Sequence, residues 1–363
     1  MGRKRKHQML VAGASGVVGH AAVEHFAALP DWEVIALSRR PVALPEGVRH
    51  VAVDLMDPGA CARAARELTG VTHVLYAALF ELPELVAGWR DARQMSTNEA
   101  MLRHLLDALE PQARGLRHVS LMQGTKAYGG HVEPAPVPCK ERWPRHAHDN
   151  FYWLQGDLLR ERQRRAGWVF TVLRPQIVLG HAVGSPMNIV GALGAYAALR
   201  REQGLPLAWP GGGRYVNGAS CSRLIAQAAE WAGTHEVAAN ETYNVVNGDA
   251  LVWQDLWAGI AARFGMAVGP DEPQSLTQTM PPQEAAWAAL AARHGLRSGS
   301  LQALVGSSWQ FTDRAFAQGV EHPALSVLSP IKLRQHGFAG CYDTEDALHH
   351  WLDRMQAERL LPR

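Results

Sequence analysis

The sequence of 363 residues has little of the features that mark several classes of protein. Lysine and arginine together number 36 and aspartate and glutamate 34, so the net charge of +2 gives no electrostatic case for a nucleic-acid partner. No apolar run approaches the ~20 residues that cross a bilayer, and the apolar stretch after the basic run Arg3-Lys4-Arg5-Lys6 is broken at once by Gly13 and Ser15. We therefore expect no signal peptide, no membrane partner and a cytoplasmic location, and we interpret the basic run as a solvated start of the chain.

Cysteine and metal-binding motifs are also scarce. The four cysteines, Cys61, Cys139, Cys221 and Cys341, lie far apart. None forms a Cys-x-x-Cys motif, which favours free thiols in a reducing compartment. The pairs His146-Ala147-His148 and His349-His350 have no accompanying His-Glu-x-x-His or cysteine set. We therefore predict no metal site.

What the first half of the chain has is a regular alternation of short apolar runs and amphipathic stretches. The predicted strands are residues 9–12, 33–37, 51–53, 74–77, 117–121 and 169–173, and the predicted helices are 17–29, 98–109 and 151–165. Alternation of this kind predicts an α/β fold, a doubly wound parallel sheet of the Rossmann type with helices on both faces.

The pattern changes after Gly180, where prolines and the run Gly211-Gly212-Gly213 indicate loops and a lobe boundary. Residues 243–246 read as a strand that returns to the sheet, and 252–264, 284–292 and 344–355 as helices. We predict a dinucleotide-binding domain over 1–180, rejoined by about 215–260. The remainder, 181–363, is predicted to be mainly a smaller, mostly helical substrate lobe.

The first motif, Gly13-Ala14-Ser15-Gly16-Val17-Val18-Gly19, lies between the first predicted strand and the first predicted helix. Glycines at this spacing permit a tight turn and let the backbone approach a pyrophosphate, while the helix N-terminus supplies N–H groups and a positive dipole. No Lys-Ser/Thr pair follows the glycines, so a P-loop is excluded. The motif predicts a dinucleotide site.

The end of the second strand predicts which dinucleotide binds. An acidic residue there would hold a ribose 2′-hydroxyl, whereas Ser38-Arg39-Arg40 suits a 2′-phosphate and so favours NADPH. Asp54 is placed to meet the adenine, and Ala77 and Ala78 are small enough for the cofactor to lie against backbone. The full set of predicted cofactor contacts is Gly13, Ser15, Gly16, Val17, Val18, Gly19, Ser38, Arg39, Arg40, Asp54, Leu55, Ala77, Ala78, Gln123, Tyr152, Pro175 and Ile177.

A Tyr-x-x-x-Lys pair, the usual catalytic motif of short-chain reductases, is absent: Gly156 stands four residues after Tyr152. The loop after the fifth strand has Gly124 where a serine is usual, but it also has Lys126, one of only five lysines. Tyr152 begins the next helix. A phenol with an ammonium nearby can hold a carbonyl oxygen and stabilise the negative charge that develops on it, although each residue alone could be an ordinary surface or half-buried side chain.

With these residues in place, the sequence resembles the progesterone 5β-reductase and iridoid synthase family of atypical short-chain reductases. The matching segments are GASGVVG (13–19), SRR (38–40), Asp54, THVLY (72–76), HVSLMQGTKAYGG (118–130), NFYW (150–153), LRPQIVLG (173–180), NETYNVVNGDALVWQDLW (240–257), ARFGM (262–266) and GFAGCYDTEDALHHWLDRM (337–355). The resemblance implies that Lys126 and Tyr152 are the catalytic pair. It implies NADPH-dependent 1,4-reduction of the activated C=C bond of an enone or enal.

The sequence departs from that family at the substrate side. Ala78-Leu79-Phe80 stands where the family has a tryptophan, and Leu154-Gln155-Gly156-Asp157 replaces its acidic residues. We expect a reshaped pocket for a small apolar carbonyl-conjugated substrate. Its predicted wall residues are Phe80, Trp153, Met187, Tyr196 and Trp309.

Three alternatives stay open at this point: a carbonyl reductase, a sugar-nucleotide epimerase and a non-enzymatic NADPH-binding regulator. The missing Tyr-x-x-x-Lys pair speaks against the first two, and the presence of both Lys126 and Tyr152 against the third. The sequence leaves a homodimer open.

Overall fold

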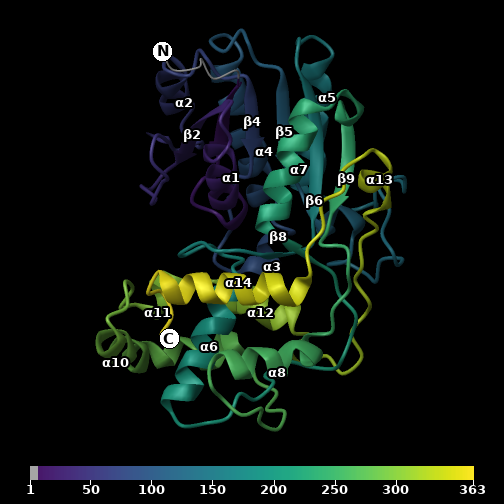
Figure 1. The fold of residues 1–363 in the computed structure, drawn as a ribbon. Helices are drawn as coiled ribbons and strands as arrows, with labels where there is room; N and C mark the ends of the chain where they lie inside the picture. The colour runs from purple at the N-terminus through teal and green to yellow at the C-terminus, as the bar shows by residue number, and fades with distance from the viewer. Residues whose placement is uncertain (1–6) are drawn as a thin grey trace.

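The fold was obtained as a computed structural model that describes residues 7–363. The basic run Arg3-Lys4-Arg5-Lys6 lies outside the described residues. The chain forms a sheet-containing half and a mostly helical half, with the long C-terminal helix running between them (Figure 1).

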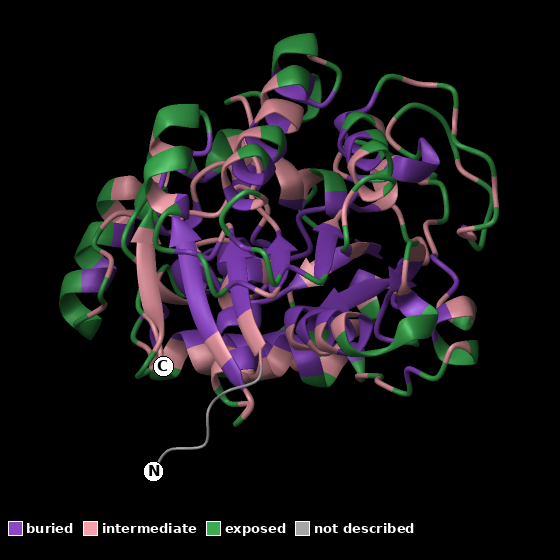
Figure 2. Ribbon diagram, turned by 90° about the horizontal axis from the view of Figure 1, so that it is seen from above, coloured by how far each residue is buried: buried purple, intermediate pink, exposed green. Residues whose placement is uncertain are grey.

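Within residues 7–363, seven parallel strands form one sheet in the order β3-β2-β1-β4-β5-β6-β9. Their bounds are β1 (His7–Ala12), β2 (Trp32–Ser38), β3 (Arg49–Ala52), β4 (His73–Tyr76), β5 (His118–Met122), β6 (Val169–Pro175) and β9 (Glu241–Val245). The central strands are buried on both faces, as their continuous apolar runs predict (Figure 2). In β1, Met9 and Val11 face one core cluster, while Leu10 and Ala12 face another.

Helices cover both faces of the sheet. On one face α1 (Val17–Ala27) packs against α7 (Ser222–Thr234), and on the other α4 (Ala92–Leu109) packs against α2 (Pro58–Ala65) and α5 (Phe151–Gln163). This arrangement confirms the doubly wound α/β fold predicted from the sequence.

The helical half is built mainly from the last third of the chain. Its helices are α6 (Ile189–Glu202), α8 (Trp253–Arg263), α9 (Leu276–Thr279), α10 (Glu284–His294), α11 (Leu301–Val305), α12 (Ser308–Ala315) and α14 (Thr344–Ala357). Short elements complete the chain: α3 (Leu85–Gly88), α13 (Ile331–Gln335) beside β9, and the parallel pair β7 (Ile177–Leu179) and β8 (Ala219–Cys221). One core cluster extends from the α1 face of the sheet into this half, so the two parts share a continuous interior.

The predicted return of the chain to the sheet is confirmed, because β9 pairs with β6 from Thr171↔Glu241 to Pro175↔Val245. The stretch after Gly180 was expected to be loops, and there the prediction missed α6. This helix is buried along twelve of its fourteen residues, so it has no polar face and its sequence lacks the helical alternation of polar and apolar residues.

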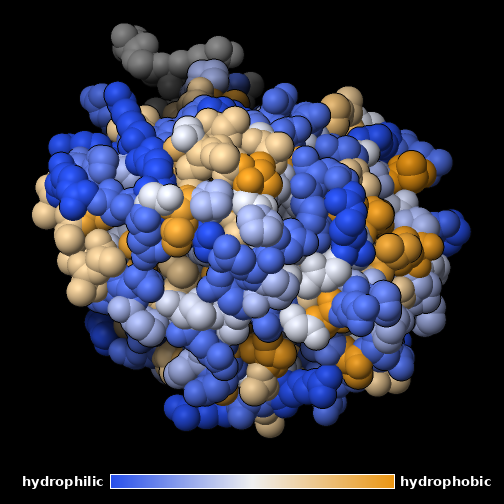
Figure 3. Space-filling model, turned by 90° about the horizontal axis from the view of Figure 1, so that it is seen from below, coloured by the Kyte–Doolittle hydropathy of each residue, from blue (hydrophilic) through white to orange (hydrophobic). Residues whose placement is uncertain are grey.

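None of the described helices is long and apolar enough to span a membrane. On the face shown in Figure 3, hydrophobic side chains occur in small groups among polar ones. This is the ordinary pattern of a protein surface and indicates no broad apolar patch on that face.

Candidate functional site

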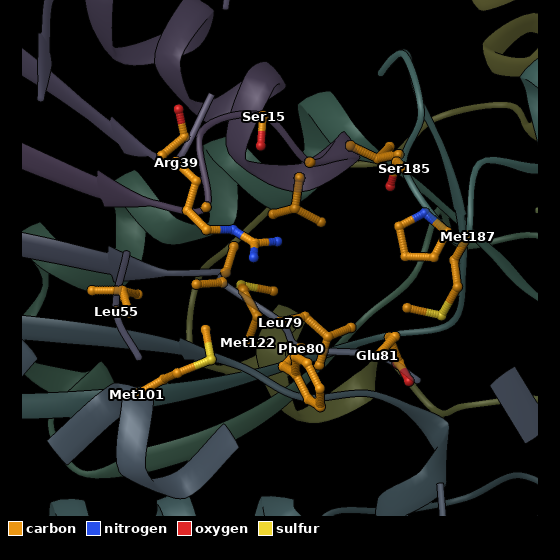
Figure 4. Close-up of a pocket in the computed structure, with 18 of the residues that line it drawn as sticks. Ser15, Arg39, Leu55, Leu79, Phe80, Glu81, Met101, Met122, Ser185 and Met187 are labelled. Carbon is orange, nitrogen blue, oxygen red and sulfur yellow. The ribbon is translucent and has the colours of Figure 1, made fainter. Parts of the chain in front are cut away.

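A cavity of about 530 Å³ lies at the carboxyl ends of the strands, where the strand order reverses between β1 and β4. Ligands of open α/β sheets bind at this point. Figure 4 shows Arg39, Leu55 and Met101 toward one end and Glu81 and Met187 toward the other. The cavity is therefore elongated, with a basic end and an end formed by the helical half.

All but two of the predicted cofactor contacts line this cavity. Those that do are Gly13, Ser15, Gly16, Val17, Val18, Ser38, Arg39, Arg40, Asp54, Leu55, Ala77, Ala78, Gln123, Tyr152 and Pro175. Gly19 lies beneath the loop, where a Cβ would meet the Gly13 carbonyl oxygen at 2.1 Å. Ile177 points into the core instead, and its strand neighbour Val178 lines the cavity, because successive side chains of a strand point to opposite faces.

The glycine loop is shaped for close approach of a ligand to backbone. Gly13 has a φ of +91°, which favours glycine, and a Cβ there would lie 2.6 Å from the Ala77 backbone. The N-cap residue Gly16 provides no side-chain hydrogen bond to the first turn of α1. The N–H groups of that turn remain available to an anion, so the loop fits a pyrophosphate.

The basic end of the cavity fits a phosphate group. Ser38 Oγ donates to the Arg40 carbonyl oxygen at 2.7 Å and lies 3.0 Å from His50 Nε2, which fixes the turn after β2. Arg39 and Arg40 are exposed, and neither forms an ion pair with a described carboxylate. Two unpaired guanidinium groups on a fixed turn are suited to the 2′-phosphate of NADPH.

Tyr152 is held at the start of α5 by a single asparagine. Asn150 Oδ1 accepts from the Tyr152 N–H at 3.0 Å, and its Nδ2 donates to the Lys126 carbonyl oxygen at 3.1 Å. A Cβ on Gly124 would lie 3.1 Å from the Tyr152 hydroxyl, so glycine leaves room for the phenol where a serine is usual. Burial raises the pKa of Tyr152, which keeps its hydroxyl protonated as a hydrogen-bond donor.

The structure brings Lys126 against Tyr152, but not onto the cavity wall. Lys126 Nζ lies 5.4 Å from the centre of the Tyr152 ring and 4.5 Å from that of Trp89. Burial lowers the pKa of Lys126 to about 8, a shift that the neighbouring carboxylate Glu81 opposes. The ammonium therefore lies behind the groups that line the cavity, a placement that the sequence did not predict.

Sequence reasoning missed three residues that shape the far end of the cavity. Glu81 lines the wall, with Oε1 3.9 Å from Lys126 Nζ. Asn98 holds the loop after β4 by accepting from the Phe80 N–H at 2.9 Å and donating to the Phe80 carbonyl oxygen at 2.8 Å. Gln94, one helical turn earlier, accepts from the Leu82 N–H at 2.8 Å. Gln94 and Asn98, two polar residues four positions apart, lie on one face of α4, and this spacing was the sequence signal that could have found them.

Of the predicted substrate-pocket residues, Phe80 and Met187 line the cavity and the others lie elsewhere. Tyr196 is buried in α6 and donates to the Ala208 carbonyl oxygen at 3.0 Å. Trp309 is 3% exposed and belongs to the core of the helical half. Trp153 donates to the His148 carbonyl oxygen at 3.2 Å and is partly buried against the cluster that contains Phe151. Large aromatic side chains at these three positions serve packing because their helices turn them away from the cavity.

The histidine pair of the loop before α5 has a structural role. His146 Nδ1 lies 2.9 Å from His148 Nδ1, and His148 Nε2 lies 3.1 Å from Asn150 Nδ2. Among residues 7–363, no group of three or more His, Cys, Asp or Glu is arranged to hold a metal ion.

Comparison with known proteins adds to this geometry. Residues 9–362 match the model of the PRISE-like Rossmann-fold domain family. The 3-oxo-Delta(4,5)-steroid 5-beta-reductase of Arabidopsis thaliana is 30% identical and aligns over 97% of this chain and 92% of its own length. An (S)-8-oxocitronellyl enol synthase of Camptotheca acuminata is 29% identical over 97% of this chain and 93% of its own length.

Solved structures resemble the whole chain. UDP-glucose 4-epimerase of Thermus thermophilus in complex with NAD has a TM-score of 0.66 at 20% identity, covering 96% of this chain and 99% of that one. RMD of Pseudomonas aeruginosa in complex with NADPH has a TM-score of 0.66 at 18% identity, covering 98% of this chain and 99% of that one. At these identities the likeness shows the fold alone.

Proposed function

Because the chain belongs to the PRISE-like Rossmann-fold domain family, we propose that it is an NADPH-dependent reductase that performs 1,4-reduction of enones or enals. The family match and the curated relatives confirm the resemblance inferred from the sequence motifs. The observation that carries the proposal is the Tyr152 phenol on the wall of an elongated cavity, with the Lys126 ammonium against its ring. Both the family and the fold support an NAD(P)-dependent oxidoreductase, and the site geometry supports the finer assignment.

The residues present fit NADPH. The glycine loop and the first turn of α1 would hold the pyrophosphate, and Arg39 and Arg40 the 2′-phosphate. Asp54 and Leu55 line the same end, where the adenine would lie, and Pro175 and Val178 line the cavity closer to Tyr152. Bound NADPH would supply the hydride.

The chain's own residues act on the carbonyl group. Tyr152 donates a hydrogen bond to the carbonyl oxygen of an enone or enal, and Lys126 provides positive charge behind the phenol. Negative charge grows on this oxygen when the C=C bond accepts a hydride, so both groups stabilise the transition state more than the bound substrate. Phe80, Leu79 and Met187 supply an apolar wall for the carbon skeleton, which also excludes water.

The function is tested by following NADPH oxidation with small enals, cyclic enones and matched saturated ketones. We expect consumption of the conjugated substrates and a product that has lost its C=C bond, identified by mass spectrometry. Oxidation with the saturated ketones alone would instead indicate a carbonyl reductase. Tight NADPH binding without turnover of any compound would indicate a regulator.

The role of Tyr152 has its own test. Tyr152→Phe should lower kcat about 10²–10³-fold, the typical cost of removing one such donor, with NADPH affinity nearly unchanged. Tyr342→Phe is the matched control, since this hydroxyl accepts from Gln227 on α7 and does not line the cavity. Equal rates for the two variants would remove Tyr152 from the mechanism.

A further inference from the structure

A series of hydrogen bonds leads from the protein surface to Asn150, the residue that joins the start of α5 to the Lys126 loop. Asn150 Nδ2 lies 3.1 Å from His148 Nε2, and His148 Nδ1 lies 2.9 Å from His146 Nδ1. The outer end is Glu133, whose Oε1 lies 2.8 Å from His146 Nε2. The Glu133 carboxylate is exposed and the Asn150 amide is buried, so the series connects solvent to the backbone of the site.

The backbone determines where the hydrogens of this series lie. Asn150 Oδ1 accepts from the Tyr152 N–H, so the amide nitrogen Nδ2 is the group that faces His148. An amide nitrogen is only a donor, and therefore His148 Nε2 is an acceptor without a hydrogen. The hydrogen of neutral His148 is then on Nδ1, which donates to His146 Nδ1. The hydrogen of His146 is on Nε2, which donates to Glu133.

The two histidines are packed against the segments that they connect. A Cβ on Gly129 would lie 2.6 Å from the His146 ring, so glycine lets this ring lie on the backbone three residues after Lys126. Trp153, in the first turn of α5, donates from Nε1 to the His148 carbonyl oxygen at 3.2 Å. The histidines are thus attached both to the loop after β5 and to α5.

We propose that His148 is a positioning residue for Tyr152 and Lys126; this rests on the enone reduction proposed above. As an acceptor, His148 Nε2 permits only the Asn150 orientation in which Oδ1 caps α5 and Nδ2 donates to the Lys126 carbonyl oxygen. That orientation fixes the backbone of both segments, and with it the position of the phenol relative to the ammonium. His148 does not line the cavity and acts through Asn150.

Protonation of His148 would undo this arrangement. The charged ring has a hydrogen on Nε2 as well, which cannot face the Asn150 N–H. The Lys126 carbonyl oxygen favours the charged ring and would accept this hydrogen in place of Asn150. Burial lowers the pKa of His148, and His146 lowers it further, so the ring is neutral at neutral pH. The titratable and charged groups that face His148 are His146 and Asp149 beside it, Glu133 beyond His146, His131 with ring centroids 5.0 Å apart, and Arg145 and Arg174 across the Trp153 ring.

The test compares His148→Leu, which removes the acceptor, with His148→Gln, whose side-chain oxygen can accept at the position of Nε2 but does not titrate. His148→Leu should lower kcat for a cyclic enone about 10–100-fold, because a displaced Tyr152 no longer meets the carbonyl oxygen, with the Kd for NADPH nearly unchanged. His148→Gln should recover most of this loss. The wild-type kcat should decline as pH falls below about 6.5, and His148→Gln should lack that decline.

Two controls belong to these assays. His322→Leu, a change at a histidine whose side chain is 91% exposed, should keep the wild-type rate and pH profile. Tryptophan fluorescence at each pH measures the folded fraction, so that rates are compared only where every variant is folded.

A combination of variants tests whether His148 acts through Asn150. Asn150→Ala should itself lower kcat, and adding His148→Leu should lower it no further, since the contact between the two residues is already gone. If the two effects multiplied instead, the role of His148 through Asn150 would be overturned.

A measurement without substrate separates this inference from the proposed function. Nitrogen NMR of the histidine rings at neutral pH should show His148 with its hydrogen on Nδ1 and none on Nε2, the signals being assigned by their loss in His148→Gln. A hydrogen on Nε2, or a wild-type rate in His148→Leu, would overturn the role of His148 alone. If the wild type consumed no enone, the proposed function would fail, and the positioning role would fail with it even where the NMR pattern was as expected.

Discussion

Lys126 is a residue whose protonation state depends on its burial in the fold. Its Nζ is enclosed by the rings of Trp89, Phe151 and Tyr152, and burial lowers its pKa to about 8. The ammonium form is needed behind Tyr152 and is lost as pH rises through about 8. We therefore expect kcat of the wild type to be constant at neutral pH and to fall as pH rises through that value, measured as a pH–rate profile at saturating NADPH.

The control for this profile is Lys126→Met, which keeps the length of the side chain without its charge. Its kcat should be about 10²-fold lower and nearly flat over the same range. A decline through about 8 that persists in Lys126→Met would assign the titration to another group.

Arg39 gives a second prediction at the residue scale. Its guanidinium lines the basic end of the cavity with no described carboxylate as a partner, so it is free to pair with a 2′-phosphate. Arg39→Ala should raise the Kd for NADPH about 10–100-fold, the usual range for a hydrogen bond to a charged group. The Kd for NADH, which lacks this phosphate, should barely change.

Isothermal titration of both cofactors decides this point. Arg114→Ala is the matched control, because this exposed arginine precedes β5 at the opposite edge of the sheet. If Arg39→Ala raised the Kd for NADPH and for NADH equally, the arginine would support the turn itself and would not bind the 2′-phosphate.

At the scale of elements, two glycines at the start of α1 differ in how much space is left for a larger side chain. A Cβ on Gly19 would lie 2.1 Å from the Gly13 carbonyl oxygen, whereas a Cβ on Gly16 would meet the same oxygen at 3.4 Å, an ordinary contact. Gly19→Ala should therefore lower the free energy of unfolding by about 1–3 kcal/mol, the cost of overpacking, and abolish tight NADPH binding. Gly16→Ala should fold with nearly wild-type stability.

Urea denaturation measures both effects, with NADPH titration alongside. The comparison holds the substitution constant and varies only the space around it. If Gly19→Ala proved as stable as Gly16→Ala, α1 would have to be able to slide on β1, contrary to the packing seen here.

Local patterns in the sequence were sufficient for the elements of the sheet half. The strand-glycine-helix pattern around Gly13 depends on neighbours in sequence, and so it predicted both an element boundary and a binding loop. The Ala- and Trp-rich stretches 252–264 and 284–292 predicted α8 and α10, and residues 344–355 predicted α14. Local patterns could not predict α6, because a helix buried on all sides has no alternation to detect.

The candidate site was predictable only in part for a related reason. The glycine loop, the Ser38-Arg39-Arg40 turn and Tyr152 each follow directly from a local motif. Glu81 contacts Lys126 because the loop after β4 packs against the loop after β5. No local sequence motif predicts this contact. Aromatic residues such as Tyr196 were assigned to the pocket by type, whereas the orientation of the helix decides which way they point.

At the scale of the whole molecule, two buried histidines lie inside the sheet, and one of them bonds to the helix that covers it. His73 on β4 and His118 on β5 are 2% and 3% exposed, and their ring centroids lie 6.2 Å apart. His73 Nε2 donates to the Gly233 carbonyl oxygen of α7 at 3.0 Å, and His118 Nε2 lies 2.9 Å from Thr171 Oγ1 of β6. Burial lowers the pKa of His73 to about 4 and that of His118 to about 3.

These pKa values predict how stability depends on pH. The unfolded chain binds protons at its histidines below about pH 6.5, but the folded chain keeps these two neutral until a much lower pH. Their contribution is therefore fully present above about pH 6.5 and is lost as pH falls toward 4, by about 1.4 kcal/mol per pH unit for each histidine. Urea-denaturation midpoints measured from about pH 7 to about pH 5 should fall steeply.

The variant that isolates this effect is His118→Gln, whose amide can still donate to Thr171 but does not titrate. Its free energy of unfolding should fall less steeply with acidification, because one of the two buried bases is gone. His322→Gln, a change at a histidine side chain that is 91% exposed, should leave the wild-type slope unchanged. Parallel curves for wild type and His118→Gln would show that His118 titrates alike in the folded and unfolded chains, and that acid sensitivity comes from other groups.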